Sequence, residues 1–179
     1  MRNLPVIALC LCLLSPFACE GQSRRTTTPA SIRMEMRQGE YIDHKIELWR
    51  KDEILRYKKL SEGRYFLFNS DESFIYLGAI LSESRPVPHG KGISRTLKRD
   101  KAGRALAEYS LCPWKRGSRH GEGFLARPDG DCCKTVWKWN KQRRDISAEL
   151  SPEEKELLDK EIQDLELAAE CFFIPQLLK

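Results

Sequence analysis

Apolar and polar residues alternate along short stretches in the first half of the chain. The alternation is clear in residues 45–48 (KIEL) and 56–58 (RYK), with a charged turn at 50–53 between them. Side chains that follow one another along a strand point to opposite faces of a sheet, so a period of two predicts half-buried strands. A helix is the alternative here, because Glu, Lys, Leu and Arg favour it and no Gly or Pro interrupts. We favour a hairpin that begins a sheet.

The pattern predicts further antiparallel strands from Gly63 to Trp139. Residues 64–68 and 73–77 are apolar and aromatic, and the polar run 69–72 between them is typical of a hairpin turn. Residues 84–88 (SRPVP) are expected to form a loop, because two prolines remove backbone donors and disfavour helix before them. Residues 98–103 are expected to form the next turn. The sequence thus predicts a meander of hairpins over residues 38–148.

The C-terminal segment, residues 149–179, has a different period. Ser151 is a candidate N-cap, Pro152 suits the first helical position, and Glu153 and Glu154 suit the positive end of a helix. Apolar residues then recur at three- and four-residue spacing, at Leu157, Leu158, Ile162, Leu165, Ala168, Ala169 and Phe172. We expect an amphipathic helix, ended by Pro175, that packs on the sheet. A helix that docks on a partner is the alternative.

Similar groups of residues recur along the predicted sheet. The stretch from Trp114 to Gly123 (WKRGSRHGEG) is followed by Pro128-Asp129-Gly130, whose Asp-Gly pair predicts a tight two-residue turn. A related His89-Gly90-Lys91-Gly92 lies upstream, and Gly63 precedes a third segment. The glycines Gly63, Gly92 and Gly123 are separated by 92 − 63 = 29 and 123 − 92 = 31 residues. A recurrence of this length is typical of stacked repeats.

These units resemble the MORN (membrane occupation and recognition nexus) repeat over about residues 63–141. The third unit is the closest match, the middle unit carries extra residues, and the first lacks the His-Gly pair. The residue pattern and the repeated units together predict a mainly β fold, an antiparallel meander of repeated β-hairpins with a C-terminal capping α-helix. The resemblance implies a binding or scaffolding role toward proteins or membrane lipids. A basic and aromatic surface is expected to serve that role: Trp114, Arg116, Arg119, His120 and Trp137. The alternative is that both tryptophans pack between repeats and that Arg116 and Arg119 form a solvated turn. For the tryptophans we favour this alternative.

The first 19 residues have the pattern of a signal peptide. Arg2 precedes an apolar run from Leu4 to Leu14, and small residues follow at Ala18 and Gly21. The run is shorter than the roughly 20 apolar residues that span a bilayer. We therefore expect an exported protein, periplasmic, cell-surface or secreted. Cys19 is a candidate for lipid attachment, although Pro16 stands where such sites usually carry an aliphatic residue. Residues 20–37 are expected to be a flexible tether.

The formal net charge is +5, but its distribution is uneven. The repeat region is basic and the C-terminal segment is acidic, so opposite charges favour docking of the helix on the sheet. The remaining positive charge suits a protein or an anionic membrane or cell-envelope surface. Nucleic acid is not the expected partner of an exported chain.

Four of the seven cysteines lie outside the signal peptide: Cys112, Cys132, Cys133 and Cys171. In an oxidising compartment an even number suggests two disulfides. Cys132 and Cys133 are expected to point to opposite faces of a strand, so one would bridge Cys112 and the other Cys171. A metal site with His120 is the weaker alternative, because the spacing matches no usual zinc pattern.

The sequence shows no local signature of a catalytic site. No nucleophile elbow, phosphate loop or dinucleotide fingerprint is present, and the histidines His89 and His120 occupy the same place in two repeat units. We expect no cofactor, no metal and no catalytic residue. The alternative is a secreted hydrolase that uses a histidine, His120 being the candidate. Substitution of His120 would then abolish turnover without lowering stability.

Overall fold

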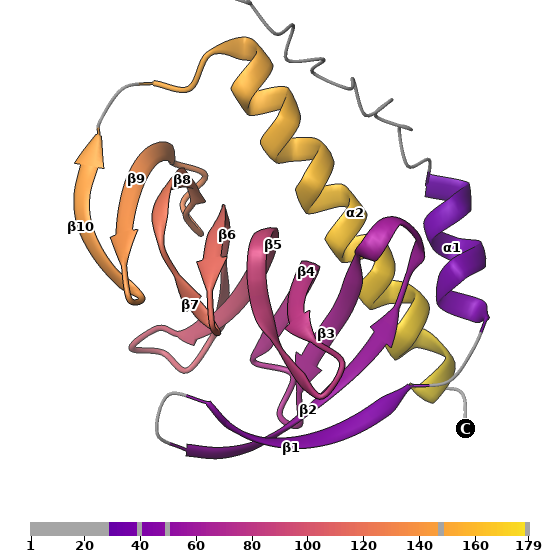
Figure 1. Ribbon diagram of the computed structural model, residues 1–179. Coiled ribbons are helices and arrows are strands. Elements are labelled where there is room, and N and C mark those ends of the chain that lie inside the picture. Colours follow the sequence, from indigo (N-terminus) through magenta and orange to yellow (C-terminus); the bar gives the residue numbers. More distant parts are fainter. Residues whose placement is uncertain (1–28, 39–40, 49–50, 147–148, 178–179) are drawn as a thin grey trace, which may run out of the picture.

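The computed structural model describes residues 29–38, 41–48, 51–146 and 149–177. The chain is mainly β: an antiparallel sheet, in which strands adjacent in sequence pair with one another, carries a long C-terminal helix on one face (Figure 1). The predicted fold class is therefore confirmed. The strands are β1 (Ile42–Leu48), β2 (Lys51–Lys59), β3 (Tyr65–Asn69), β4 (Phe74–Ser82), β5 (Arg85–Arg99), β6 (Ala105–Lys115), β7 (Ser118–Arg119), β8 (Gly121–Ala126), β9 (Cys132–Lys138) and β10 (Lys141–Ile146). The helices are α1 (Pro29–Arg37), the short 3₁₀ helix η1 (Ser61–Gly63) and α2 (Pro152–Leu177).

The sheet buries apolar side chains on both faces. On β3 and β4 the alternation places Phe66, Phe68 and Ile75 on the face that α2 covers, and Leu67 and Tyr76 on the other. Each face therefore has a core of its own. Complete burial of one large apolar side chain contributes roughly 1.5–3 kcal/mol to stability. The opposite face is built around Phe74, Tyr76, Trp114 and Trp137.

Helix α2 begins as the sequence predicts and continues further than expected. The Ser151 hydroxyl accepts a hydrogen bond from the amide of Glu154 (3.3 Å), and the Glu154 carboxylate accepts one from the amide of Ser151 (2.9 Å). This reciprocal pair is a capping box. The helix does not end at Pro175 but reaches Leu177. A proline in the last turn removes only one backbone donor, which allows the extra residues.

Ion pairs link α2 to the sheet along its length. Arg95 Nη1 lies 2.7 Å from Glu166 Oε2, and the Tyr109 hydroxyl donates to Glu166 Oε1 at 3.0 Å. Nearer the start of the helix, Lys134 Nζ lies 2.8 Å from Glu154 Oε1. These basic residues of the sheet are thus paired with the acids of α2. Leu157, expected in the apolar stripe, is instead 46% exposed.

Part of the expected tether forms a helix. Residues 29–37 make up α1, which lies beside the C-terminal half of α2 (Figure 1) and buries Ile32 and Met36 in the covered face of the sheet. Lys58 Nζ donates to the carbonyl of Met36 at 2.8 Å, which caps the end of the helix. The tether prediction is therefore wrong for this segment. The predicted signal peptide, the lipidation candidate Cys19 and residues 20–28 lie outside the described residues.

Two predicted turns differ in detail. Residues 85–88 are not a loop but the start of β5, where Pro88 pairs with Ile80 across an irregular register. The pairing of β5 with β6 begins only at Gly90, so the prolines need no donor toward that side. The β8–β9 connection spans residues 127–131 rather than two residues, with Gly130 at a φ of 87°. The β3–β4 hairpin is confirmed, and β1 pairs with β2 as expected, although residues 51–53 of the expected turn belong to β2.

Glycines cross the middle of the sheet in one row. Gly92 on β5 pairs with Gly78 on β4 and with Cys112 on β6, and Gly123 on β8 pairs with Thr135 on β9. A Cβ atom at Gly92 would lie 2.2 Å from the hydroxyl of the buried Tyr76. Gly92 is therefore required for Tyr76 to lie across the backbone. Gly63, aligned with these glycines in the sequence, lies in η1 outside the sheet.

Candidate interaction surface

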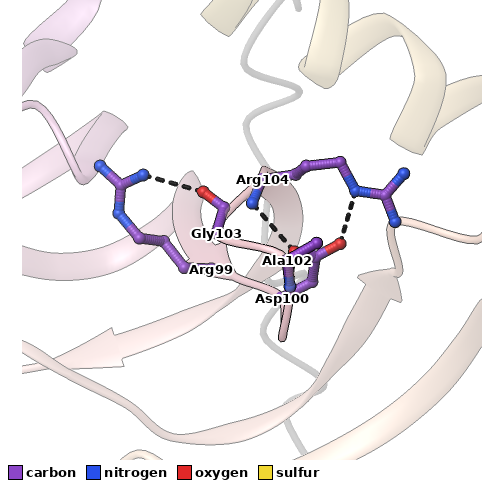
Figure 2. Close-up of polar contacts among 5 residues, drawn as sticks. All are labelled: Arg99, Asp100, Ala102, Gly103 and Arg104. Carbon is purple, nitrogen blue, oxygen red and sulfur yellow. Dashed lines mark hydrogen bonds and ion pairs between the residues drawn. The ribbon is translucent and has the colours of Figure 1, made fainter.

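The turns that connect the strands lie at two opposite ends of the sheet. The two ends differ in whether the charged side chains of their turns form ion pairs. At one end, which we call the aspartate end, lie the turns 69–73, 100–104 and 127–131. Asp100 shows how these turns are built (Figure 2): Oδ1 accepts the amides of Ala102 (2.8 Å) and Arg104 (2.9 Å), and Oδ2 accepts Arg104 Nε (2.7 Å). The hydrogen bonds that Asp100 accepts from the amide of Arg104, from the side chain of Arg104 and from the amide of Ala102 hold the pKa of Asp100 below its usual value.

The same device recurs in the neighbouring turns of the aspartate end. Asp71 Oδ1 accepts the amide of Ser73 (3.0 Å), and Asp129 Oδ1 accepts the amide of Asp131 (3.1 Å). The three aspartates are separated by 100 − 71 = 29 and 129 − 100 = 29 residues. Three of the cations here are paired with carboxylates: Lys98 with Glu108, Arg104 with Asp100 and Arg127 with Asp131. Arg99 bonds to the carbonyl of Gly103, and Lys101 has no ion pair among the described residues. The aspartate end is therefore largely neutralised by its own residues.

The opposite end carries two tight turns, residues 115–118 and 138–141, which we call the basic end. Lys115 pairs with Ser118, and Lys138 pairs with Lys141, so each loop has two residues. Both central residues have positive φ: 50° and 81° at Arg116 and Gly117, 54° and 64° at Trp139 and Asn140. These are type I′ turns, whose twist matches that of the strands. Trp139 is unusual, because a bulky side chain in this backbone region is strained.

The two turns are hydrogen-bonded into one unit. The amide of Arg119 donates to Asn140 Oδ1 (2.7 Å), and the amide of Asn140 donates to the carbonyl of Arg119 (3.1 Å). On its other side, the first turn is held by β5, because the amide of Gly117 donates to the carbonyl of Pro88 (2.8 Å). The basic end thus presents its side chains from a fixed backbone.

The cations of this end are left unpaired. Lys115, Arg116, Lys138 and Lys141 are exposed, and in the part of the chain that the structure describes none of them has a carboxylate within ion-pair distance. Trp139 stands among them with half of its surface exposed. Lys115 Nζ lies 5.8 Å from the centroid of the Trp139 ring, a cation–π distance. The result is an exposed aromatic side chain with one lysine near its ring and two further lysines at the ends of its own turn.

Two of the five residues expected on the binding surface are buried. Trp114 is 4% exposed to solvent and Trp137 is 2% exposed, and both lie in the core on the face opposite α2. They follow Cys112 and Cys133 at alternate positions on their strands, and this phase points them inward. The expectation that they form a surface is therefore wrong, and the packing alternative is confirmed.

Arg119 is also part of the framework rather than the surface. Its Nη1 donates to the buried Ser110 hydroxyl at 2.8 Å, and its guanidinium lies 5.6 Å from the ring centroid of Trp137. Arg116, by contrast, is exposed at the tip of its turn. Of the predicted surface residues, Arg116 and the half-buried His120 thus remain beside the exposed basic turns.

His89 and His120 each lie against a turn of the basic end. His89 Nδ1 accepts the amide of Arg116 at 3.3 Å, and the His120 ring lies 5.2 Å from the centroid of Trp139. Among the described residues, no hydrogen bond or ion pair joins either ring to a hydroxyl, thiol or carboxylate. The Nδ1 atom of His120 is enclosed and has no hydrogen-bond partner there. The His89 ring therefore contacts the turn 115–118, and the His120 ring contacts the turn 138–141.

The four described cysteines are free thiols, so neither expected bridge is present. Cys112 lies on β6 and Cys133 on β9, with β8 between them. Two strand spacings amount to about 9.6 Å, beyond the roughly 7 Å that a disulfide spans between Cα atoms. Cys132 lies near Lys155 and Asp159, whereas Cys171 is 171 − 159 = 12 residues further along α2, about 18 Å away. Burial raises the pKa of the Cys112 thiol to about 12.

Comparison with known proteins adds no assignment to this geometry. No family model and no curated protein matches the sequence. Within the described ranges, no group of three or more His, Cys, Asp and Glu side chains could hold a metal ion. No helix in the same ranges is long and apolar enough to cross a bilayer.

The residues that distinguish the two ends were not predicted from the sequence. Trp139, Lys115 and Lys138 were not singled out, although a Trp-Lys pair begins both turns, at 114–115 and 137–138. That repeated pair, followed by Arg-Gly in one case and Trp-Asn in the other, is the signal that could have revealed them. The spacing of 29 residues between the turn aspartates was likewise present in the sequence.

Proposed function

We propose that this chain is an exported, non-catalytic binding or scaffolding protein whose basic end docks on an anionic membrane surface. The observation that carries the proposal is the pair of fixed type I′ turns, with the exposed Trp139 and four exposed cations that have no carboxylate partner among the described residues. Each Lys or Arg near an anionic bilayer contributes about 1 kcal/mol to binding. Four such residues on one rigid end therefore supply a useful affinity without any deep pocket.

Trp139 favours a bilayer over a flat protein partner or a sugar. The ring has His120 and Lys115 close to it, so its faces are partly occupied while about half of the side chain remains exposed. Tryptophan prefers the headgroup region of a membrane, where its apolar body and polar N–H are both accommodated. The strained backbone at Trp139 indicates that a large aromatic side chain is retained there despite a conformational cost.

Two sequence features support the same proposal. The predicted signal peptide would deliver the chain to an envelope or cell surface, and the resemblance to MORN repeats implies contacts with membrane lipids or proteins. The acidic helix α2 lies along the face of the sheet, where Glu154 and Glu166 are paired with Lys134 and Arg95. Its charge therefore does not neutralise the basic end.

The test measures binding of the full-length protein to vesicles of phosphatidylglycerol mixed with phosphatidylcholine, and to phosphatidylcholine alone. We expect binding to the anionic vesicles only, decreasing as salt screens the charges. The variant Lys115→Glu/Lys138→Glu should lose at least about a hundredfold in affinity, because two attractive charges become repulsive. Both side chains are exposed and have no carboxylate partner among the described residues, and only the cation–π contact of Lys115 with Trp139 is lost, so the thermal unfolding temperature should change little.

The matched control is Lys101→Glu/Lys155→Glu, which changes the net charge equally. Lys101 lies in a turn of the aspartate end and Lys155 lies on α2, and both are exposed. This control should retain binding to within a few-fold. Equal losses in the two double variants would show that net charge alone drives binding, and the proposal for the basic end would fail. Absence of any binding by the unmodified protein would reject membrane docking altogether.

A further inference from the structure

We infer that the tip of the β4–β5 hairpin, residues 81–85, is a second membrane contact, in which Leu81 enters the headgroup region and Arg85 binds lipid phosphate. This inference rests on the proposed function and deepens it, because it assigns a further segment to the surface that meets the bilayer. The position of the hairpin, its fixed shape and its two exposed side chains carry the inference.

The hairpin tip lies at the same end of the sheet as the two turns of the basic end. Neighbouring strands of an antiparallel sheet run in opposite directions, so every second connection lies at the same end. The connections β4–β5, β6–β7 and β9–β10 therefore share one end of the sheet, and β3–β4, β5–β6 and β8–β9 share the other. In the β4–β5 connection Ser82 pairs with Arg85, so that Glu83 and Ser84 form the turn.

Hydrogen bonds join the hairpin to the basic end. The carbonyl of Pro88, near the start of β5, accepts the amide of Gly117 at 2.8 Å. The turn 115–118 is in turn joined to the turn 138–141, because the amide of Arg119 donates to Asn140 Oδ1 at 2.7 Å. The three connections are therefore held in one arrangement and can meet one surface together.

The tip keeps its shape through its own residues. The amide of Arg85 donates to Ser82 Oγ at 3.1 Å, and Ser82 Oγ lies 3.0 Å from Ser84 Oγ, within hydrogen-bond distance. Residues 86–88, which follow the tip, are buried against the sheet. A segment that is already ordered loses little conformational freedom when it binds, so more of its contact energy contributes to affinity.

The acidic residue of the tip is neutralised within the protein. Glu83 accepts hydrogen bonds from Lys59 Nζ at 2.7 Å and from the Tyr65 hydroxyl at 3.0 Å, and these bonds hold the pKa of Glu83 below its usual value. Arg85, by contrast, is exposed and has no carboxylate within ion-pair distance in the described part of the chain. The tip therefore offers a positive charge to an anionic headgroup.

Leu81 gives the tip an apolar side chain for the bilayer. It is 37% exposed, whereas its neighbour Ile80 packs against the core opposite α2. A single exposed leucine is ordinary on a soluble protein, but this one adjoins an available cation at the end of the sheet that also carries Trp139. Apolar side chains flanked by cations suit the headgroup region, which accommodates the former and attracts the latter.

The test uses tryptophan fluorescence and phosphatidylglycerol vesicles whose acyl chains carry bromine, which quenches indole on contact. Trp114 and Trp137 are buried, so Trp139 is the exposed reporter among the described tryptophans. In the full-length variant Leu81→Trp/Trp139→Phe the exposed reporter moves to the hairpin tip. Vesicles are supplied in excess, until sedimentation shows that all the protein is bound. We expect the brominated lipid to quench this variant more strongly than Trp139→Phe alone.

The matched control is Ile54→Trp/Trp139→Phe. Ile54 is 48% exposed and lies on β2 beside Leu55, which pairs with Asn69 at the start of a turn of the aspartate end. Its reporter is therefore as accessible to solvent as that at position 81 but lies at the other end of the sheet. This control should show no more quenching than Trp139→Phe alone.

A second readout measures affinity for unbrominated phosphatidylglycerol vesicles. Arg85→Gln should raise the dissociation constant about fivefold, because one cation at the membrane is lost. Lys101→Gln removes the same charge from an exposed position of the aspartate end and should bind like the unmodified protein. Thermal unfolding of each variant shows whether it has folded.

The outcomes separate this inference from the proposed function. Absence of vesicle binding by the unmodified protein rejects the proposed function itself. Binding without added quenching in Leu81→Trp/Trp139→Phe overturns the inference and leaves docking through the basic end intact. Equal quenching at positions 81 and 54 overturns it as well, since contact would then not be confined to one end of the sheet. So does a loss of affinity in Arg85→Gln that does not exceed the loss in Lys101→Gln.

Discussion

Two groups of turns at opposite ends of the sheet, the aspartate end and the basic end, differ in how many of their cations have a carboxylate partner. At the aspartate end, Asp71, Asp100 and Asp129 each bind the amides of their own turn, and Lys98, Arg104 and Arg127 have carboxylate partners. At the basic end, the turns are fixed by backbone geometry and by Asn140, and four cations have no carboxylate partner among the described residues. The backbone of one end is stabilised by its charged side chains, and that of the other is not.

This difference separates structural charge from charge that is available for binding. An exposed ion pair contributes at most about 1 kcal/mol to the free energy of unfolding. A surface cation without such a partner has no ion pair to lose when it is substituted. Substitutions at the two ends should therefore affect different properties. Those at the aspartate end should alter stability, and those of the exposed cations at the basic end should alter binding.

The largest effect is expected from Gly92→Ala, which disturbs the sheet between the two ends. The added Cβ would lie 2.2 Å from the Tyr76 hydroxyl, and Tyr76 is fully buried. We expect a loss of about 3 kcal/mol in the free energy of unfolding. Gly63→Ala is the control: its Cβ meets open space, so only the backbone strain at a φ of 70° remains, about 1 kcal/mol. Equal losses would show that Tyr76 has room to move. Urea unfolding measures both.

The next largest effect should distinguish residues of the basic end that stabilise the fold from residues that are exposed for binding. Arg119→Met removes the hydrogen bond to the buried Ser110 hydroxyl and the stacking on Trp137, which should cost about 2 kcal/mol. Lys115→Met, at an exposed position, should leave stability unchanged and weaken vesicle binding. A stable Arg119→Met variant with impaired binding would instead place Arg119 on the interaction surface.

Trp139→Gly should change stability and binding in opposite directions. Glycine relieves the strain of a positive φ, so we expect stabilisation by about 0.5–1 kcal/mol, measured by thermal unfolding. Vesicle binding should weaken because the aromatic anchor is lost. A destabilised Trp139→Gly would mean that contact with His120 and Lys115 outweighs the strain, and that Trp139 has a structural role.

The smallest effect concerns the pH dependence of the aspartate end. Hydrogen bonds from Arg104 and Ala102 lower the pKa of Asp100, so the folded state favours its ionised form. Stability from Asp100 is therefore present above its unfolded pKa of about 3.9 and is lost as the pH falls through the lower folded value. In Asp100→Asn this part of the acid sensitivity should disappear, as measured by urea unfolding across this pH range. An unchanged acid profile would show that Asp100 carries no linkage.

The elements predicted correctly from the sequence are those whose local residue pattern favours the same structure as their packing in the folded chain. The hairpins β1–β2 and β3–β4 and the start of α2 at Ser151 combine turn or capping residues with a suitable apolar period. Helix α1 was missed because tertiary contacts stabilise it: Lys58 caps Met36, and Glu35 accepts from the amide and hydroxyl of Ser61. Such partners, more than 20 residues away, leave no local periodic signal.

The candidate site was predicted only in part. Arg116 and His120, two of the expected surface residues, lie at the basic end. The direction of an aromatic side chain depends on the phase of its strand. Trp114 and Trp137 share the inward phase, whereas Trp139 occupies the tip of a turn. Nothing in the local sequence favours a tryptophan with positive φ, because such a residue is strained there. The pairing state of the lysines likewise depends on neighbours that only the folded chain brings together.

The length of α2 limits how many hairpins this architecture can hold. With 26 residues the helix is about 39 Å long, and it contacts the sheet from Lys134 on β9 to Phe68 on β3. One further 29-residue unit would add two strands and widen the sheet by about 9.6 Å. The helix would then need roughly six more residues to cover the new apolar surface. Addition or removal of a pair of strands would thus require a matching change in the length of the distant C-terminal helix, so the length of α2 sets the width of sheet that it can cover.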